Sequence, residues 1–409
     1  MINIKQTLLL ITLMLFSYSV LANDVFVALD KLAQSEQAPK VYANKLLDDG
    51  FQEIYFEGAT FEGKQTRIFA FYKAPEGKGP FPAMVLVHGG GGSAFKEWVD
   101  KWNNAGFAAI SIATEGQTGY LTGKKQPKWE KNKWGGPRRP GIYNDPERAT
   151  NNQWMNQSIT AAIQAHNLLR SFNEVKKDEI GISGISWGGV ITSTVIGFDQ
   201  RFAFAIPIYG SGFLDTMQNK YGKILSKPTH NYYREIWEPA LRIAKFKNPT
   251  FWLTGLKENN FSLDAQANTY KLLQGIHYQS IQPTLKHSHK YGWAPKEPYI
   301  FARSVLNHKL LPAFYDEKIM NEIVSINVKN IQNNDTENSI SSTLYYTNDL
   351  GHTLDRKWHE QPVKINTSKN GITLASTLPK TATAWVFNIE ANGLIYSSEF
   401  SERTTPTAL

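Results

Sequence analysis

Residues 179–189 read Glu-Ile-Gly-Ile-Ser-Gly-Ile-Ser-Trp-Gly-Gly, and this stretch decides how the chain can fold. Its first five residues form a mostly apolar run that predicts a buried strand, and the Val-, Ile- and Thr-rich segment that follows predicts a helix. Gly184, Ser186 and Gly188 form a Gly-x-Ser-x-Gly turn between the two. Side chains at the glycine positions would collide with the neighbouring strand and helix, so the spacing predicts a sharp turn that exposes Ser186 as a nucleophile.

Short apolar runs alternate with amphipathic segments on both sides of this turn. The runs predict strands buried on both faces, and they lie at residues 83–87, 107–112, 179–183, 202–208, 250–253 and 278–285. Helical spacing is found at residues 95–104, 154–172, 190–197 and 263–273. Two alternating segments, which predict an antiparallel edge, lie at residues 51–56 and 66–72. This order predicts an α/β fold with a mostly parallel sheet and helices on both faces.

Helical periodicity disappears from about residue 319 to the C-terminus. Short β-rich pieces separated by Gly, Asn and Pro lie at residues 342–347, 371–377, 383–389 and 394–398. Their spacing predicts a small all-β sandwich domain at residues 319–409, with a long loop at residues 330–341. The α/β domain would then occupy residues 23–318.

The first 22 residues have the three-part plan of a secretory signal peptide. Lys5 is followed by an apolar run at residues 8–16, and the small residues Val20 and Ala22 flank Leu21 before the expected cleavage site. We therefore expect cleavage after Ala22 and a periplasmic or secreted protein. The run is too short to span a membrane, and no later stretch reaches the required length of about 18 apolar residues, so we expect no membrane span.

The composition excludes several kinds of chemistry. The chain contains no cysteine, which excludes disulfides, a cysteine nucleophile and thiolate metal ligands. A formal net charge of +8 could attract nucleic acid, but the chain lacks a basic helical stripe. We therefore expect an anionic substrate or surface polymer and no nucleic-acid partner.

A glycine-rich loop at residues 88–92, His-Gly-Gly-Gly-Gly, closes the first predicted buried strand. Backbone N–H groups stabilise the negative oxygen of a tetrahedral intermediate only where the main chain approaches closely, which glycine permits. We expect the oxyanion hole to consist of the N–H groups of Trp187 and Gly90, with Gly91 as the alternative to Gly90. His88 is expected to support the loop.

A serine nucleophile in this setting needs an acid and a histidine later in the chain. Glu258 follows the predicted strand at residues 250–253 and is the preferred acid, and Asp264, at a helix start, is the alternative. His287 follows the last predicted strand and is the preferred base, with His289 as its alternative. A metal site at the two histidines would need further ligands, and none is evident nearby, so we expect none.

The segment at residues 116–150 shows little periodicity and lies between a predicted strand and a predicted helix. Such loops at the carboxyl ends of parallel strands shape substrate pockets. Aromatic faces stack on sugar rings, and basic groups pair with sulfate or carboxylate. The expected substrate-binding residues are Trp129, Trp134, Lys131, Lys133, Arg138 and Arg139. The alternative is a solvated, charged loop whose tryptophans pin it to the protein.

Several of these segments resemble a known group of enzymes. Residues 88–92 and 184–189 are similar to those of bacterial acetylxylan-esterase-like members of the prolyl-oligopeptidase and dienelactone-hydrolase superfamily, and residues 251–255 and the His-x-His segment match the same group. The resemblance spans roughly residues 81–310. It implies an α/β-hydrolase fold and ester hydrolysis, often of acyl groups on polysaccharides.

The chain departs from this group at two positions. The relatives usually have Asp where this chain has Glu258, and Gly where it has Ser288. A Glu can replace Asp in such triads, so Glu258 remains the preferred acid. Residues 344–347 and 383–385 look like the small β-sandwich of PhoPQ-activated pathogenicity-related proteins and of some relatives.

We therefore expect a serine carboxylic-ester hydrolase that acts on a carbohydrate ester or another small ester. The favoured substrate is a polysaccharide or oligosaccharide that carries acetyl or similar acyl groups, and an anionic one would suit the basic insertion. The reaction needs no cofactor. One alternative is a peptidase of the prolyl-oligopeptidase type, which would usually carry a propeller where this chain has only a short segment. The other is a carbohydrate-binding protein with an inactive hydrolase domain, which the intact serine, histidines and glycine loop disfavour.

Overall fold

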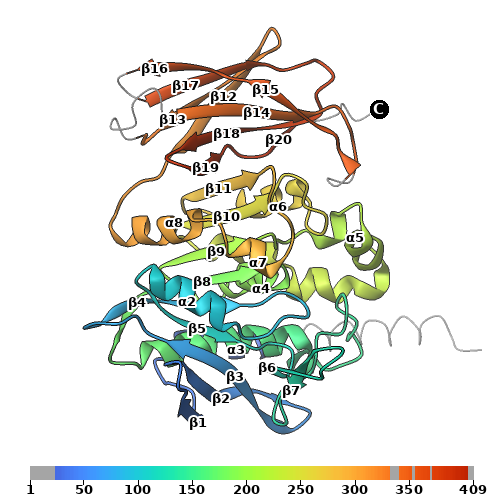
Figure 1. The fold of residues 1–409 in the computed structure, drawn as a ribbon. Coiled ribbons are helices and arrows are strands. Elements are labelled where there is room, and N and C mark those ends of the chain that lie inside the picture. Colours follow the sequence, from blue (N-terminus) through green and yellow to red (C-terminus); the bar gives the residue numbers. More distant parts are fainter. Residues whose placement is uncertain (1–23, 332–339, 352–354, 369–370, 404–409) are drawn as a thin grey trace, which may run out of the picture.

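The computed structural model of the protein describes residues 24–331, 340–351, 355–368 and 371–403 (Figure 1). The predicted signal peptide at residues 1–22 lies outside these residues, as does most of the loop predicted at residues 330–341. Within the described ranges, no helix combines the length and the apolarity needed to cross a membrane.

The predicted buried strands form the parallel part of a large mixed sheet. Their spatial order is β5-β4-β8-β9-β10-β11, and each neighbouring pair is parallel. Their bounds are β4 (Phe81–Val87), β5 (Ala108–Ile112), β8 (Val175–Ile185), β9 (Phe204–Ile208), β10 (Thr250–Gly255) and β11 (His277–Gln282). Most of their side chains are buried, which explains the continuous apolar runs and confirms the predicted α/β class.

An antiparallel edge extends this sheet beyond β5. It consists of β1 (Val41–Leu46), β2 (Gln52–Phe61) and β3 (Lys64–Lys73), and β3 pairs with β5. The predicted edge at residues 51–56 and 66–72 is therefore confirmed as β2 and β3.

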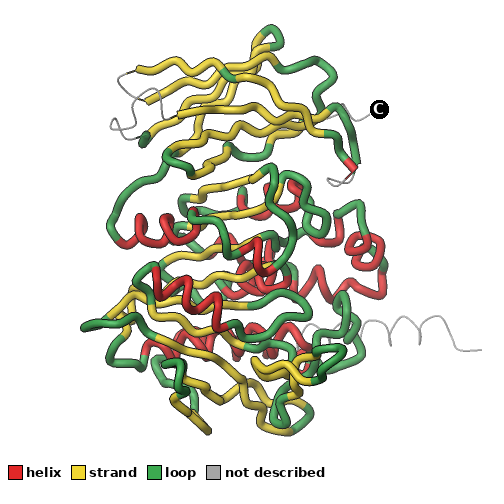
Figure 2. The backbone as a smooth tube through the Cα atoms, viewed as in Figure 1, coloured by secondary structure: helices red, strands yellow, loops and turns green. Residues whose placement is uncertain are grey.

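Helices cover both faces of the sheet (Figures 1 and 2). One face packs against α2 (Lys96–Asn104) and α8 (Glu297–Leu306), and the other against α3 (Trp154–Arg170) and α4 (Trp187–Val195). On β10, Phe251 contacts α8 and the next residue, Trp252, contacts α6 (Leu263–Tyr270). Because successive strand residues point to opposite faces, α6 lies on the face away from α8.

The C-terminal region is built from strands, as predicted. One sheet contains β12 (Ala313–Met320), β13 (Ile323–Lys329), β16 (Lys364–Ser368) and β17 (Gly371–Thr377). The other strands are β14 (Ile340–Thr347), β15 (Trp358–Pro362), β18 (Ala384–Ala391), β19 (Leu394–Ser397) and β20 (Ser401–Glu402). A second hydrophobic cluster, which includes Val324, Leu374 and Phe387, lies between the two groups.

This region differs from a separate domain in two respects. β12 runs across the predicted boundary at residues 318 and 319, so the strand-rich part begins at Ala313. β19 pairs with β11 through Ser397 and Gln279, so β14, β15, β18 and β19 continue the main sheet. The physical reason is that β11 would otherwise be an edge strand with unpaired backbone groups.

Other elements lie in segments without clear periodicity. The insertion contains a hairpin of β6 (Gln117–Thr122) and β7 (Lys128–Lys131), and residues 24–34 are helical. Two further helices are α5 (Lys220–Leu225) and α7 (His289–Gly292). Short helical turns lie at Thr150–Asn152, Leu214–Thr216, Pro228–His230, Tyr233–Trp237, Pro239–Leu241 and Ile243–Lys245.

Candidate active site

Ser186 occupies the turn between β8 and α4. Its backbone has φ 59° and ψ −118°, and its N–H donates to the carbonyl of Ile208 at 2.8 Å. A Cβ atom at position 184 would lie 2.0 Å from the carbonyl oxygen of Gly188, and one at position 188 would lie 2.0 Å from that of Val87. Only glycine fits at these positions, and the strained turn holds the serine above the strand ends.

His287 and Glu258 lie next to this serine. The Nε2 atom of His287 is 2.9 Å from Ser186 Oγ, and its Nδ1 atom is 2.8 Å and 2.9 Å from the two carboxylate oxygens of Glu258. The ring packs against those of Tyr209 and Phe261. The structure thus brings together a hydroxyl, an imidazole and a carboxylate in the relative positions that a serine triad requires.

Glu258 is held by its own loop, whereas Asp264 lies elsewhere. Glu258 is buried, and its Oε1 accepts hydrogen bonds from the N–H groups of Asn260 at 2.7 Å and Phe261 at 3.2 Å. Asp264 lies in the first turn of α6 and lines a cavity with Arg356 of the C-terminal region. Of the two predicted acids, Glu258 is therefore the one in contact with His287.

His289 lies against the glycine loop, and its Nε2 bonds to that loop instead of to the serine hydroxyl. Its Nε2 accepts a hydrogen bond of 2.8 Å from the N–H of Gly89, and a Cβ at position 92 would lie 2.7 Å from the same nitrogen. Burial, helped by the charges of His88 and His287, lowers the pKa of His289 to about 3. The neutral ring can therefore act as an acceptor at neutral pH, and it supports the loop.

The remaining N–H groups of the glycine loop distinguish Gly90 from Gly91. The N–H of Gly91 donates to Glu115 Oε1 at 3.2 Å, and that of Gly92 donates to the carbonyl of Gly89 at 3.0 Å. The N–H of Gly90 makes no hydrogen bond with any described residue, and neither does that of Trp187 at the start of α4. These two groups are free to bind an oxyanion, at the positive end of a helix.

His88 supports the loop, as expected. Its Nε2 accepts a hydrogen bond of 3.0 Å from the N–H of Thr114, which leaves Nδ1 to donate to the carbonyl of Gly89 at 2.7 Å. Burial lowers the pKa of this histidine to about 4, so it stays neutral at neutral pH. Neither ring nitrogen is available for proton transfer with a substrate.

The predicted substrate-binding residues separate into two groups. Trp129 donates from Nε1 to the carbonyl of Gly91 at 2.8 Å, so it borders the site. Trp134 instead packs against Tyr55, and the cations of Arg67 and Lys133 lie over its ring at 4.4 Å and 4.0 Å. Those cations occupy the surface that a sugar would stack on.

The basic residues of the insertion also differ in position. Lys131, Lys133 and Arg138 are exposed, whereas Arg139 reaches the ring of Trp187, next to Ser186 in the chain. Arg139 donates from Nε to Oε1 of Glu115 at 3.1 Å, and Glu115 is buried. Glu115 was not among the predicted site residues, although its position three residues after the end of buried strand β5 could have indicated it.

The indole of Trp187 forms an aromatic wall beside the serine. It contacts Tyr143, Trp154, Tyr221 and Phe261. Burial raises the pKa of Tyr221 to about 12, so this hydroxyl remains protonated. Trp187 itself is buried, and electrostatic interactions beside a buried apolar wall are stronger than in water.

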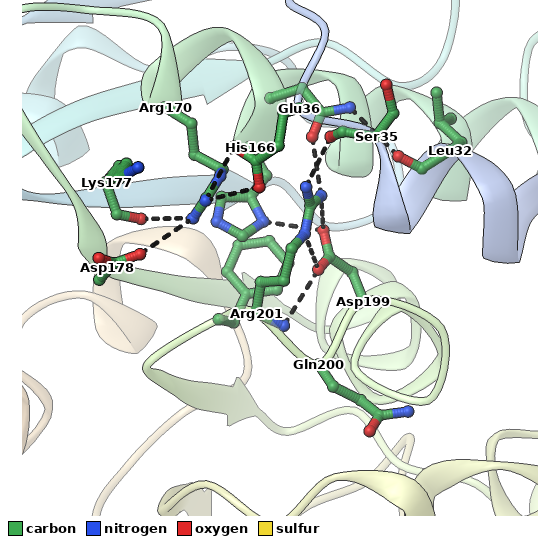
Figure 3. A network of polar contacts seen from close by, with 12 residues as sticks. Leu32, Ser35, Glu36, His166, Arg170, Lys177, Asp178, Asp199, Gln200 and Arg201 are labelled. Carbon is green, nitrogen blue, oxygen red and sulfur yellow. Dashed lines mark hydrogen bonds and ion pairs between the residues drawn. The ribbon is translucent and has the colours of Figure 1, made fainter.

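Another histidine lies in a separate polar network under α3 (Figure 3). His166 Nδ1 is 2.8 Å from Asp199, and Arg201 donates to the same carboxylate and to the carbonyl of Ser35. Both His166 and Asp199 are fully buried. This network joins residues near the start of the described chain to α3 and to the segment after α4. Neither here nor elsewhere among the described residues are three His, Asp or Glu side chains grouped so that they could hold a metal ion.

Comparisons with known proteins identify the family. The profile of the Acetyl xylan esterase (AXE1) family matches residues 34–245, slightly more than half of the chain. The matched residues include Ser186 and the glycine loop.

Two solved structures are also similar to this chain. The acetyl xylan esterase of a Paenibacillus species aligns with a TM-score of 0.53 at 18% identity, covering 69% of this chain and 92% of that chain. Acetyl Xylan Esterase 1 of a Thermoanaerobacterium species aligns with a TM-score of 0.50 at 17% identity, covering 69% and 93%. At these identities the structural likeness establishes the α/β-hydrolase fold. The chain belongs to the acetyl xylan esterase (AXE1) family and is a carboxylic ester hydrolase.

Proposed function

We propose that this protein removes acetyl or similar acyl groups from a polysaccharide or oligosaccharide through an acyl-enzyme on Ser186. One observation carries the proposal: the continuous contacts from Ser186 Oγ to His287 at 2.9 Å and from His287 to Glu258 at 2.8 Å. Family membership supports an acetyl ester as the substrate. The reaction needs no cofactor, because every group that it uses belongs to the protein.

The mechanism follows from these contacts. Ser186 Oγ attacks the acyl carbonyl while His287 Nε2 accepts its proton, and Glu258 stabilises the resulting imidazolium. The N–H groups of Gly90 and Trp187 bind the oxyanion. The alcohol of the sugar leaves with the proton from His287. Water then attacks the acyl-enzyme by the same route, which releases the carboxylic acid and restores Ser186.

The test combines active-site labelling with product release. The wild-type protein and Ser186→Ala are treated with a fluorophosphonate probe, and acetate release from acetylated xylan is followed on the same samples. We expect the variant to lose labelling and to lose activity by a factor of about 10⁵ or more. Labelling without acetate release would contradict the substrate, and a wild type that does neither would favour an inactive, carbohydrate-binding protein.

We further propose that the insertion at residues 116–150 favours an anionic polysaccharide. Three exposed basic residues support this, namely Lys131, Lys133 and Arg138, together with the net charge of +8. Replacing all three with Gln should raise KM for an acetylated acidic polysaccharide several-fold at low salt. Added salt should abolish the difference, since exposed charges are screened. A difference in KM that persists in high salt would contradict an electrostatic role.

The proposed location is the periplasm or the outside of the cell. The composition of residues 1–22 supports it. Mass spectrometry of protein recovered after expression in a bacterial host should give a chain that starts at Asn23. A mature chain that retains these residues would overturn the proposal.

A further inference from the structure

Arg139 is held rigidly before any substrate binds. Its Nε donates to Glu115, its Nη1 donates to the carbonyl of Gly141, and its Cζ lies 5.0 Å from the centre of the Trp187 ring. The side chain is only 20% exposed. A guanidinium that is both hydrogen-bonded and stacked loses little further freedom when it binds a ligand.

The third nitrogen of the guanidinium, Nη2, faces the glycine loop. A Cβ atom at position 90 would lie 2.6 Å from Nη2 and 2.9 Å from Cδ1 of Trp187. The guanidinium therefore lies beside Gly90 and Trp187, whose N–H groups are the proposed oxyanion donors. Within the described part of the chain, Nη2 has no hydrogen-bond acceptor, so it remains available to a ligand.

Glu115 couples this arginine to the glycine loop. Its Oε1 accepts hydrogen bonds from Arg139 Nε at 3.1 Å and from the N–H of Gly91 at 3.2 Å, and the residue is 8% exposed. The carboxylate thus fixes the loop and the arginine relative to each other. It also occupies the N–H of Gly91, which leaves that of Gly90 free.

We propose that Arg139 is a catalytic residue whose Nη2 donates a hydrogen bond to the ester carbonyl oxygen as that oxygen becomes negatively charged. This inference rests on the proposed function. When Ser186 Oγ bonds to the carbonyl carbon, the π electrons pass to the oxygen and the serine proton passes to His287. Arg139 keeps its protons throughout. When the intermediate collapses, the electrons return, the bond to the sugar oxygen breaks and His287 protonates that oxygen.

This role differs measurably from recognition of an acidic sugar by the same residue. A group that stabilises the oxyanion acts only in the transition state, so its loss lowers kcat for every ester. A group that holds a substrate carboxylate acts before the reaction, so its loss raises KM for acidic substrates alone. A charged donor is also stronger than a neutral N–H group, which predicts a large effect on kcat.

The experiment measures kcat and KM for Arg139→Ala and Arg139→Lys with a neutral ester, p-nitrophenyl acetate, and with an acetylated acidic polysaccharide. Arg148→Gln is the matched control, because this arginine of the same insertion lies over the ring of Phe61. We expect Arg139→Ala to lower kcat about 100-fold on both substrates, with KM within about threefold. Guanidinium chloride, well below denaturing concentrations, should restore part of this loss. The control should behave as the wild type.

Arg139→Lys keeps a positive charge but not the planar fork, so we expect an intermediate loss of about tenfold with an unchanged Tm. This variant carries the test if the alanine variant does not fold. A wild-type kcat in either folded variant would overturn the proposal, as would an effect confined to KM for the acidic substrate. A wild type that neither reacts with a fluorophosphonate nor hydrolyses the neutral ester would instead contradict the proposed function.

Discussion

Two histidine–carboxylate pairs in this molecule have the same nitrogen–oxygen distance but different surroundings. Nδ1 of His287 is 2.8 Å from Glu258, and Nδ1 of His166 is 2.8 Å from Asp199 (Figure 3). His287 follows β11 at the edge where the parallel strands end, and its second nitrogen meets a serine. His166 lies within α3, stacks on Phe202 at 3.9 Å and is fully buried.

The difference shows that a carboxylate orients a histidine without making it a catalytic base. Asp199 also binds the guanidinium of Arg201, so its charge is already neutralised in the folded protein. The Nε2 atom of His166 is buried and has no hydrogen-bond partner among the described residues, so no nucleophile is within its reach. His287 differs in its position at the carboxyl edge of the sheet and in its contact with the Ser186 hydroxyl.

The largest expected effect comes from Glu258, the carboxylate of the proposed catalytic pair. Glu258→Gln should lower kcat by about 10³- to 10⁴-fold, because the amide cannot stabilise the imidazolium of His287. Asp264→Asn is the matched control, and its kcat for p-nitrophenyl acetate should stay within about twofold of the wild type. The assignment of Glu258 as the acid would be wrong if the Asp264 variant lost as much activity as the Glu258 variant.

A smaller effect is expected at His289. His289→Ala should lower kcat about tenfold, because the N–H of Gly89 loses its acceptor and the glycine loop shifts. His289→Gln should recover part of the activity, since its amide oxygen can accept the same bond. Because burial holds the pKa of His289 at about 3, the pH dependence of kcat near neutrality should not move in either variant. A displaced pH profile would identify His289 as the base.

The buried pair should affect stability and leave catalysis unchanged. Asp199→Asn removes one partner of a buried charged network, so denaturant unfolding should show a loss of about 3 kcal/mol in the free energy of unfolding. The kcat per folded molecule should equal that of the wild type. Asp178→Asn is the control, because Asp178 is exposed and pairs with Arg170 at 3.6 Å. Its free energy of unfolding should stay within about 0.5 kcal/mol of the wild-type value. Loss of kcat at Asp199 would show that the two pairs are coupled.

The carboxylate of Asp199 should also make the stability of the fold decrease slightly at acidic pH. Burial raises the pKa of Asp199, but hydrogen bonds from Arg201 and His166 outweigh this effect and hold the pKa at about 2, below its usual 3.8. A depressed pKa stabilises the fold above the unfolded value, and this contribution disappears as the pH falls from about 4 to about 2. The stability difference between wild type and Asp199→Asn should therefore shrink by about 2 kcal/mol over that range. A constant difference would contradict the assignment.

Much of the architecture was predictable because the hydrophobic period is unambiguous where both faces of a strand are buried. Residues 83–87 and 250–253 lie in β4 and β10 for this reason. Strands with one exposed face carry a weaker signal. β12 and β16, which have mostly exposed or half-exposed side chains, were therefore missed. The continuation of the main sheet through β19 was also missed, because long-range pairing leaves no local pattern.

The candidate site was predictable to a similar extent. The turn at Ser186 follows from its glycines, and the choice of Glu258 and His287 followed from their places after strands. These residues now lie in contact, and their catalytic roles remain predictions. Side-chain contacts between distant segments leave no local pattern in the sequence and were not predicted. Examples are the hydrogen bond from Gly89 to His289 and the Glu115–Arg139 pair.

The junction of β11 with β19 has a consequence for any attempt to isolate the catalytic unit. Backbone pairing of Gln279 with Ser397 is reinforced by Ser397 Oγ, which accepts the N–H of Ile281, and by Asn388, which donates to the carbonyl of Ile281. In a chain cut before β12, β11 would become an exposed edge strand with unpaired backbone amides. Such an edge can pair with a strand of another chain. The C-terminal strands thus cover an edge that could otherwise pair with another chain, and we expect a truncated enzyme to aggregate before its activity could be assayed.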